Sequence, residues 1–187
     1  MFQHLLESIA RSLDRRKIPY MVVGGQAVLL YGEPRLTRDI DVTLGIGPER
    51  HKEIGELAAE LGWKVLVDVP AEFVRKSLVL PCADPKSGIR VDFIFSFSEY
   101  ERQALTRVRR VPMGNTEVRF VAVEDLIIHK LVAGRPRDVE DVRNILLKRP
   151  ILDLPYLRRW LEDFDLSLGG SHLQTFERLL SSGDSIT

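Results

Sequence analysis

The spacing of apolar side chains changes its period along this 187-residue chain. Residues 2–16 carry apolar side chains at every third or fourth position, which predicts an amphipathic helix with one buried stripe. Short apolar runs predict strands at 20–23 and 39–44, with a helix at 26–31 and a polar loop at 32–38 between them. The first quarter of the chain therefore predicts strands and helices in alternation.

The rest of the chain divides into a mixed part and a helical part. The pattern predicts a helix at 48–61, strands at 64–67, 77–80 and 89–95, a turn at 84–88, and a hairpin of 107–111 with 117–121, while 70–75 stays open. Helical spacing then returns at 123–133, 137–147, 154–164 and 172–180. We expect an α+β (α/β) fold: a mixed sheet flanked by helices in a core domain (1–122), with a C-terminal helical segment (123–187) packed on it.

Acidic side chains stand on two of the predicted strands. Asp39 and Asp41 are two residues apart and share one strand face, where they repel each other unless one is protonated or a cation lies between them. Asp92 lies on the face of strand 89–95 that also carries Arg90. If the two strands are neighbours, three carboxylates converge at a spacing suited to one or two Mg²⁺ (or Mn²⁺) ions.

Two glycines, Gly24 and Gly25, separate the first strand from the helix that follows. Such a turn presents backbone N–H groups and the positive end of the helix dipole to an anion. A plain strand-to-helix turn is the alternative, and the two readings are compatible. Metal ligands on one side and amides on the other describe a site for a nucleoside triphosphate (NTP).

These residues resemble a known superfamily. The order of motifs is similar to that of the DNA polymerase β-like nucleotidyltransferases: a strand followed by GlyGly, then Asp39-Ile40-Asp41, then Val91-Asp92-Phe93. More narrowly, the chain resembles the AbiEii-like nucleotidyltransferases, which are toxin components of bacterial toxin–antitoxin pairs. Three segments carry this resemblance: GlyGlnAlaValLeuLeuTyrGly, ArgLeuThrArgAspIleAsp and AspLeuIleIleHisLysLeuValAlaGlyArgProArgAspValGluAspVal. The resemblance covers residues 20–147.

The resemblance implies roles for individual residues. Those matching Asp39 and Asp41 bind the metals, and the one matching Asp92 completes the triad and can act as the base on the incoming hydroxyl. The glycines matching Gly24 and Gly25 hold the triphosphate. A lysine and a later aspartate, here Lys130 and Asp138, belong to the active site as well.

Lys130 is a candidate site residue even without the resemblance, because it shares a helix face with the apolar Leu126 and Ile127. A cation on that inward side needs an anionic partner, which a nucleotide phosphate could provide. Asp138 and Asp141 either position Lys130 or form exposed ion pairs. A lysine that extends to solvent is the alternative for Lys130 itself.

The loop before the acidic strand supplies further candidates. We expect Arg35, Thr37 and Arg38 to contact the nucleotide, and a solvated charged loop is the alternative.

Composition limits the partners. The 27 basic and 27 acidic residues cancel, so no overall field draws the chain to nucleic acid. The single cysteine, Cys82, excludes an internal disulfide and suits a reducing compartment. No apolar window is long enough for a signal peptide or a membrane span, so we expect a cytoplasmic protein without a membrane partner.

Together these features predict a metal-dependent nucleotidyltransferase that moves a nucleoside monophosphate from an NTP to an acceptor hydroxyl. By the resemblance, the acceptor is a tRNA 3′ end, and the partner of such a toxin is a cognate antitoxin protein. A protein hydroxyl or a small molecule such as an antibiotic stays open as the acceptor. The alternative from another class is a non-catalytic module that binds a nucleotide or a partner protein.

Overall fold

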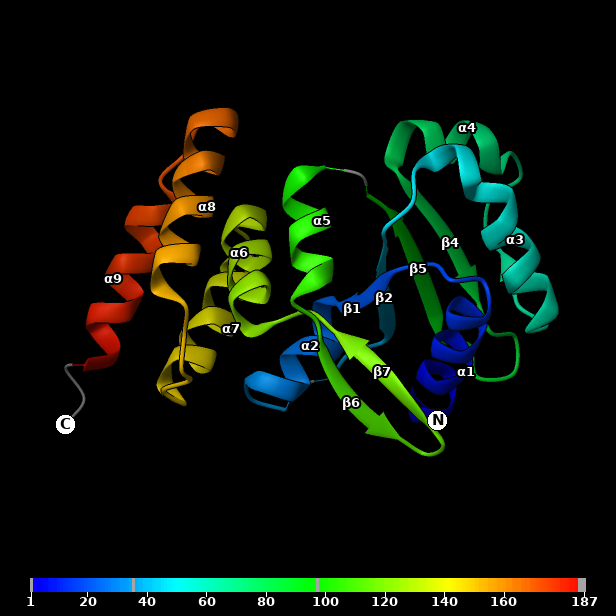
Figure 1. The fold of residues 1–187 in the computed structure, drawn as a ribbon, viewed down its shortest axis with the longest axis horizontal. Helices are drawn as coiled ribbons and strands as arrows, with labels where there is room; N and C mark the ends of the chain where they lie inside the picture. The colour runs from blue at the N-terminus through cyan, green and yellow to red at the C-terminus, as the bar shows by residue number, and fades with distance from the viewer. Residues whose placement is uncertain (1, 35, 97, 185–187) are drawn as a thin grey trace. The chain divides into compact units, whose positions relative to one another are not determined.

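The computed structural model describes residues 2–34, 36–96 and 98–184 (Figure 1). The first half of the chain forms α1 (Phe2–Arg15), β1 (Tyr20–Val23), α2 (Gly24–Tyr31), β2 (Asp39–Leu44), the 3-10 helix η1 (Pro48–Arg50), α3 (His51–Glu60), β3 (Lys64–Val65), α4 (Pro70–Ser77), β4 (Val79–Ala83) and β5 (Arg90–Phe95). The second half forms α5 (Glu99–Thr106), β6 (Arg109–Met113), β7 (Thr116–Phe120), α6 (Val123–Ala133), α7 (Pro136–Leu147), α8 (Leu154–Leu168) and α9 (His172–Asp184).

Within the described residues, the strands form a seven-stranded mixed sheet in the order β3-β4-β5-β2-β1-β7-β6. The pairs β2–β5 and β1–β7 are parallel, and the other neighbours are antiparallel. Helix α1 packs on β7, and α3 and α4 pack on β4 (Figure 1). The predicted mixed sheet flanked by helices is confirmed.

One prediction between residues 70 and 106 needs correction, and one helix in this range was not predicted. The predicted strand 77–80 begins too early, because Ser77 is the last residue of α4 and Leu78 takes a left-handed conformation (φ 58°) that ends the helix before β4. Helix α5 was not predicted. It begins at a capping signal that the sequence contains, since the Ser98 hydroxyl accepts a hydrogen bond from the Glu101 N–H at 3.2 Å.

The chain divides into two compact units. The first spans residues 1–26 and 36–121 and contains the sheet with α1, α3, α4 and α5. The second spans 27–35 and 122–187, so the division falls inside α2. The packing of the C-terminal helices on the core domain stays a prediction.

The second unit has its own apolar core, to which α6, α7, α8 and α9 all contribute. The end of α2 and the residues after it belong to this unit. Lys148 donates a hydrogen bond to the Gly32 carbonyl and pairs with Glu33 at 3.3 Å. No helix in the described ranges has the length and apolar character needed to cross a membrane.

Candidate functional site

The acidic side chains predicted to meet lie on adjacent strands. Strands β2 and β5 run in parallel, and their register places Asp41 opposite Asp92 and Asp39 opposite Arg90. Neighbours directly opposite each other project from the same face of a sheet. Asp39, Asp41 and Asp92 therefore share one face, as expected, while Ile40 and Val91, which alternate with them, are fully buried.

Gly24 is required at its position by Asp41. Strand β1 pairs with β2 so that Val23 lies opposite Asp41, and the chain then turns into α2 beside that carboxylate. Gly24 has a left-handed conformation (φ +62°), and a Cβ atom there would lie 2.0 Å from Asp41 Oδ2. The first glycine of the GlyGly pair thus lets the backbone approach the acidic face closely.

The loop before β2 is fixed by Gln26, a residue for which the sequence pattern indicated no role. Its side-chain amide donates a hydrogen bond to the Thr37 hydroxyl at 2.8 Å, and both residues are buried. Arg38, by contrast, is exposed, and Arg35 lies outside the described residues. Thr37 therefore helps to hold the loop to the start of α2, and contact of these residues with a nucleotide stays a prediction.

The acidic face also carries a cation, Arg90, which the strand period placed there without indicating a function. Arg90 Nε donates a hydrogen bond to Asp92 Oδ1 at 2.7 Å. This hydrogen bond, with the nearby charges of Asp92, Asp39 and Asp41, raises the pKa of the Arg90 guanidinium despite some loss of solvation. The signal in the sequence was an arginine two residues before an aspartate on one strand, a spacing that puts both on one face.

The donor set of this face suits a hard divalent cation, since Mg²⁺ and Mn²⁺ prefer carboxylate oxygens. Gly24 leaves room for the Asp41 carboxylate beside a helix start, which also fits an ion and its anionic ligand. In the part of the chain that the structure describes, however, no three Asp, Glu, His or Cys side chains are gathered closely enough to enclose a metal ion. The sheet thus places the three aspartates on one face, but among the described residues their carboxylates do not form a closed metal site.

Lys130 lies in a buried charge cluster of the second unit. Its Nζ contacts Asp138 Oδ1 at 2.8 Å and Asp141 Oδ2 at 2.9 Å, and all three side chains are at most 7% exposed. Arg135 adds a second cation to Asp138. Burial alone would raise the pKa of Asp138, but the hydrogen bonds from Arg135 and Lys130 lower it below its ordinary value.

The burial of this cluster decides one of the alternatives left open by the sequence. Asp138 and Asp141 both hold Lys130, and neither forms an exposed ion pair through it. Two carboxylates thus compensate the charge of the buried Lys130 ammonium within the second unit. Its contact with a nucleotide phosphate stays a prediction.

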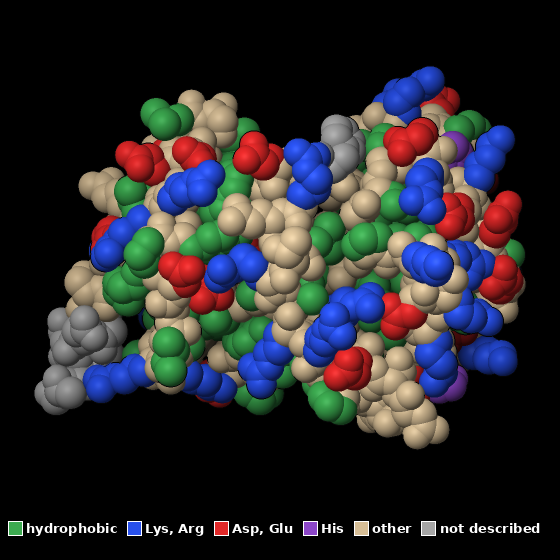
Figure 2. Space-filling model, in the orientation of Figure 1, with side chains coloured by type: hydrophobic (Ala, Val, Ile, Leu, Met, Phe, Trp, Pro, Cys, Tyr) green, Lys and Arg blue, Asp and Glu red, His purple; other side chains and the backbone are tan. Residues whose placement is uncertain are grey.

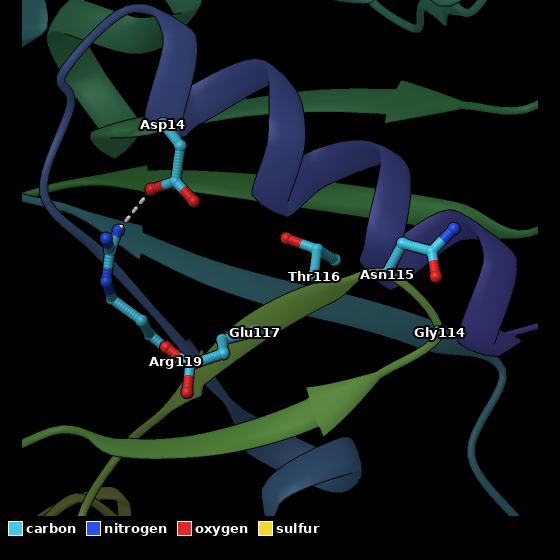
Figure 3. A pocket seen from close by; sticks show the side chains of 6 residues that line it. All are labelled: Asp14, Gly114, Asn115, Thr116, Glu117 and Arg119. Carbon is cyan, nitrogen blue, oxygen red and sulfur yellow. Dashed lines mark ion pairs between the residues drawn. The ribbon is translucent and has the colours of Figure 1, made fainter.

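Other surface features of the first unit involve residues other than Asp39, Asp41 and Asp92. A hollow between α1 and the β6–β7 hairpin contains Asp14 and Arg119, which form an ion pair at 2.6 Å (Figure 3). Arg16 of α1 forms an ion pair with Glu60 of α3 at 2.5 Å. Acidic and basic side chains intermingle over the face in Figure 2, in keeping with the balanced charge of the sequence.

Comparison with known proteins gives a match over most of the chain. Residues 1–176 match the profile of a family described as "Nucleotidyltransferase of unknown function (DUF6036)". No curated protein matches the chain. These matches do not include the AbiEii-like family, so the narrower resemblance stays a prediction.

Several solved structures share the fold. The antibiotic-resistance factor ANT(2'')-Ia has a TM-score of 0.60 at 17% identity, over 89% of this chain and 94% of that one. The lincosamide antibiotic adenylyltransferase LnuA has a TM-score of 0.53 at 15% identity, over 75% of this chain and 93% of that one. A putative nucleotidyltransferase from Thermotoga maritima has a TM-score of 0.52 at 19% identity, over 79% and 93%. At such identities the likeness is one of fold.

Proposed function

Because the chain belongs to this family of nucleotidyltransferases, we propose that it transfers a nucleoside monophosphate from an NTP to an acceptor hydroxyl. In this reaction the acceptor oxygen bonds to the α-phosphorus, the bond from that phosphorus to the oxygen bridging to the β-phosphate breaks, and pyrophosphate leaves. The observation that carries the proposal is the register of β2 and β5, which puts Asp39, Asp41 and Asp92 on one face beside Gly24.

We assign the metal-binding function to Asp39, Asp41 and Asp92. Mg²⁺ or Mn²⁺ held there would neutralise charge on the phosphates and orient the reacting oxygens. Asp92 also accepts the proton of the acceptor hydroxyl, as a carboxylate on the same face can. Catalysis then consists mostly of positioning and charge stabilisation.

The start of α2 is the proposed phosphate site. The N–H groups at Gly24 and Gly25 lie at the positive end of the helix, and Gly24 adjoins the carboxylate of Asp41, so phosphates held here would lie beside a proposed metal ligand. Arg35, Thr37 and Arg38 of the following loop are proposed to contact the same nucleotide. Lys130, supported by Asp138, is proposed to belong to the active site.

For the acceptor we propose a tRNA 3′ end, on the AbiEii-like resemblance, and with it a function as the toxin of a toxin–antitoxin pair in the cytoplasm. A small molecule is the second candidate, because ANT(2'')-Ia and LnuA are described as an antibiotic-resistance factor and a lincosamide antibiotic adenylyltransferase. A protein hydroxyl is the third.

The test is incubation of the purified chain with each labelled NTP, Mg²⁺ or Mn²⁺, and in turn total tRNA, cell protein, and aminoglycoside or lincosamide antibiotics. We expect label transfer to one acceptor class, lost on addition of a chelator and in Asp39→Asn and Asp41→Asn. Transfer that persists in both variants would contradict the assignment of the acidic face.

The same protein allows a test of the non-catalytic alternative. Calorimetry with NTP and Mg²⁺ should show binding that Asp41→Asn weakens. Nucleotide binding without transfer to any acceptor would favour a binding module, whereas no binding at all would leave a protein-binding module as the better explanation.

A further inference from the structure

We propose that Arg90 couples metal binding to nucleotide binding: it competes with the metal for Asp92 when no nucleotide is present, and its guanidinium binds the nucleotide's phosphates when the metal is loaded. This inference rests on the proposed function, because it takes the acidic face as the site of both ligands. It adds Arg90 to the site as a substrate-binding residue, and it gives a physical cause for cooperative binding of metal and nucleotide.

The first step of the argument is the contact itself. Arg90 and Asp92 are two residues apart on β5, on the same face, and Nε lies 2.7 Å from Oδ1. The Asp92 side chain is only 17% exposed, whereas that of Arg90 is 53% exposed. The carboxylate is thus partly withdrawn from water and its counter-ion is at the surface, so a metal that binds Asp92 is repelled by the adjacent guanidinium.

The second step is the charge of the face. Asp39, Asp41 and Asp92 carry three negative charges and Arg90 one positive charge, and the register places Arg90 opposite Asp39. A guanidinium bonded to a carboxylate lowers that carboxylate's affinity for a second cation by direct repulsion.

The third step is what the guanidinium offers to a ligand. Arg90 contacts Asp92 through Nε, and the terminal nitrogens of an arginine provide further donors in a planar fork that matches phosphate oxygens. Once a metal takes up the negative charge of the carboxylates, an anionic ligand becomes the favoured partner of Arg90.

Coupling follows from these two contacts by linkage. Nucleotide phosphates attract the guanidinium away from Asp92 and so improve metal binding, and the metal improves nucleotide binding by the same factor. The wild-type protein should therefore bind the metal weakly alone and much more tightly with nucleotide.

Arg90→Gln tests this with binding alone, without a need to know the acceptor. Calorimetry with Mn²⁺ and no nucleotide should show binding about 3- to 10-fold tighter in Arg90→Gln than in the wild type, because the repulsion is gone. NTP binding in saturating Mn²⁺ should be about 10-fold weaker or more, the size of a lost charged hydrogen bond. The factor by which NTP improves Mn²⁺ affinity should fall accordingly.

Three variants complete the experiment. Arg90→Lys should restore part of the coupling, since it keeps the charge and loses the fork. Arg75→Gln, at an exposed position of α4, is the matched control and should change neither affinity. Asp92→Asn should remove most of the Mn²⁺ affinity, and adding Arg90→Gln should then have a much smaller effect on it.

The outcomes separate this inference from the proposed function. If the wild type binds Mn²⁺ and NTP and Arg90→Gln leaves both affinities unchanged, Arg90 only stabilises the strand, and the inference alone is overturned. If Arg90→Gln weakens Mn²⁺ binding, the competition is likewise wrong. If the wild type binds neither ligand, both the inference and the proposed function fail.

Discussion

The carboxylate of Asp41 occupies the space that a side chain at position 24 would need. A Cβ on Gly24 would lie 2.0 Å from Asp41 Oδ2, which is too short for any real contact. The backbone at Gly24 is also left-handed, at φ +62°, a conformation that costs other residues about 1 kcal/mol or more. The glycine and the acidic strand are thus two halves of one local structure.

Gly24→Ala should therefore damage both stability and activity. We expect a loss of about 1–3 kcal/mol in the free energy of unfolding, from the strained backbone and the displaced carboxylate. Nucleotidyl transfer should fall by about 100-fold or more, the order seen when a positioned charged or polar group is moved from its site. Urea unfolding and the label-transfer assay measure the two effects.

Gly55→Ala is the matched control for Gly24→Ala. Gly55 lies in α3, and no atom lies within 4 Å of the place where its Cβ would stand. Alanine there should stabilise the helix by about 0.5–1 kcal/mol and leave transfer unchanged. Equal effects at the two positions would contradict a special function of Gly24.

Lys130→Met should strongly destabilise the second unit. Removing the ammonium leaves Asp138 and Asp141 buried without their shared cation, and breaking such a cluster costs about 3–5 kcal/mol. Urea unfolding of the full chain measures the loss. Arg143→Met is the control, because the Arg143–Glu140 pair is exposed on the same helix as the two acids and should contribute at most about 1 kcal/mol. A similar small loss in both variants would refute the view of Lys130 as the centre of a buried cluster.

Tyr156→Phe should destabilise the contact between α6 and α8. The Tyr156 hydroxyl donates a hydrogen bond to Asp125 Oδ1 at 2.6 Å, and Asp125 is fully buried. Losing a hydrogen bond and leaving a buried carboxyl oxygen without it costs about 1–3 kcal/mol in the free energy of unfolding. In an Asp125→Ala background, which removes the acceptor, the same substitution should cost clearly less. An equal cost in both backgrounds would show that the two side chains do not interact.

His129 should make stability depend on pH. Burial, and secondarily the charge of Lys130, lowers the pKa of His129 to about 4 from its ordinary 6.5. The unfolded chain therefore takes up a proton as pH falls below 6.5 while the folded chain does not, so this contribution is complete above pH 6.5 and is lost towards pH 4. Since the ring is half-buried, we expect a loss of about 1–2 kcal/mol, less than the full shift would give at about 1.4 kcal/mol per unit.

The comparison of His129→Gln with the wild type isolates this effect. Unfolding free energies measured between about pH 7 and pH 4.5 should fall less steeply in His129→Gln, and the difference between the two curves should grow as pH drops. His4→Gln, on the exposed face of α1, should keep the wild-type slope. Parallel curves for His129→Gln and the wild type would contradict the prediction.

The sequence by itself determined the local elements and the identity of the acidic residues. The strands at 20–23 and 39–44 were predicted with the bounds that the structure has, because apolar periodicity and glycine or proline breaks act over a few neighbouring residues. The shared face of Asp39 and Asp41 followed from the same period. Around Leu78 the prediction was wrong, and α5 was missed although Ser98 and Glu101 form a capping signal in the sequence.

Only the tertiary structure decided which distant residues meet. The register that sets Asp41 opposite Asp92 depends on hydrogen bonds between strands about fifty residues apart, and no local period encodes it. The same holds for Asp41 in the space beside Gly24, for Gln26 on Thr37, and for the two acids on Lys130. The strand period predicted that Arg90 and Asp92 share a face. Their contact, however, depends on side-chain orientation and on the charges of the neighbouring strand.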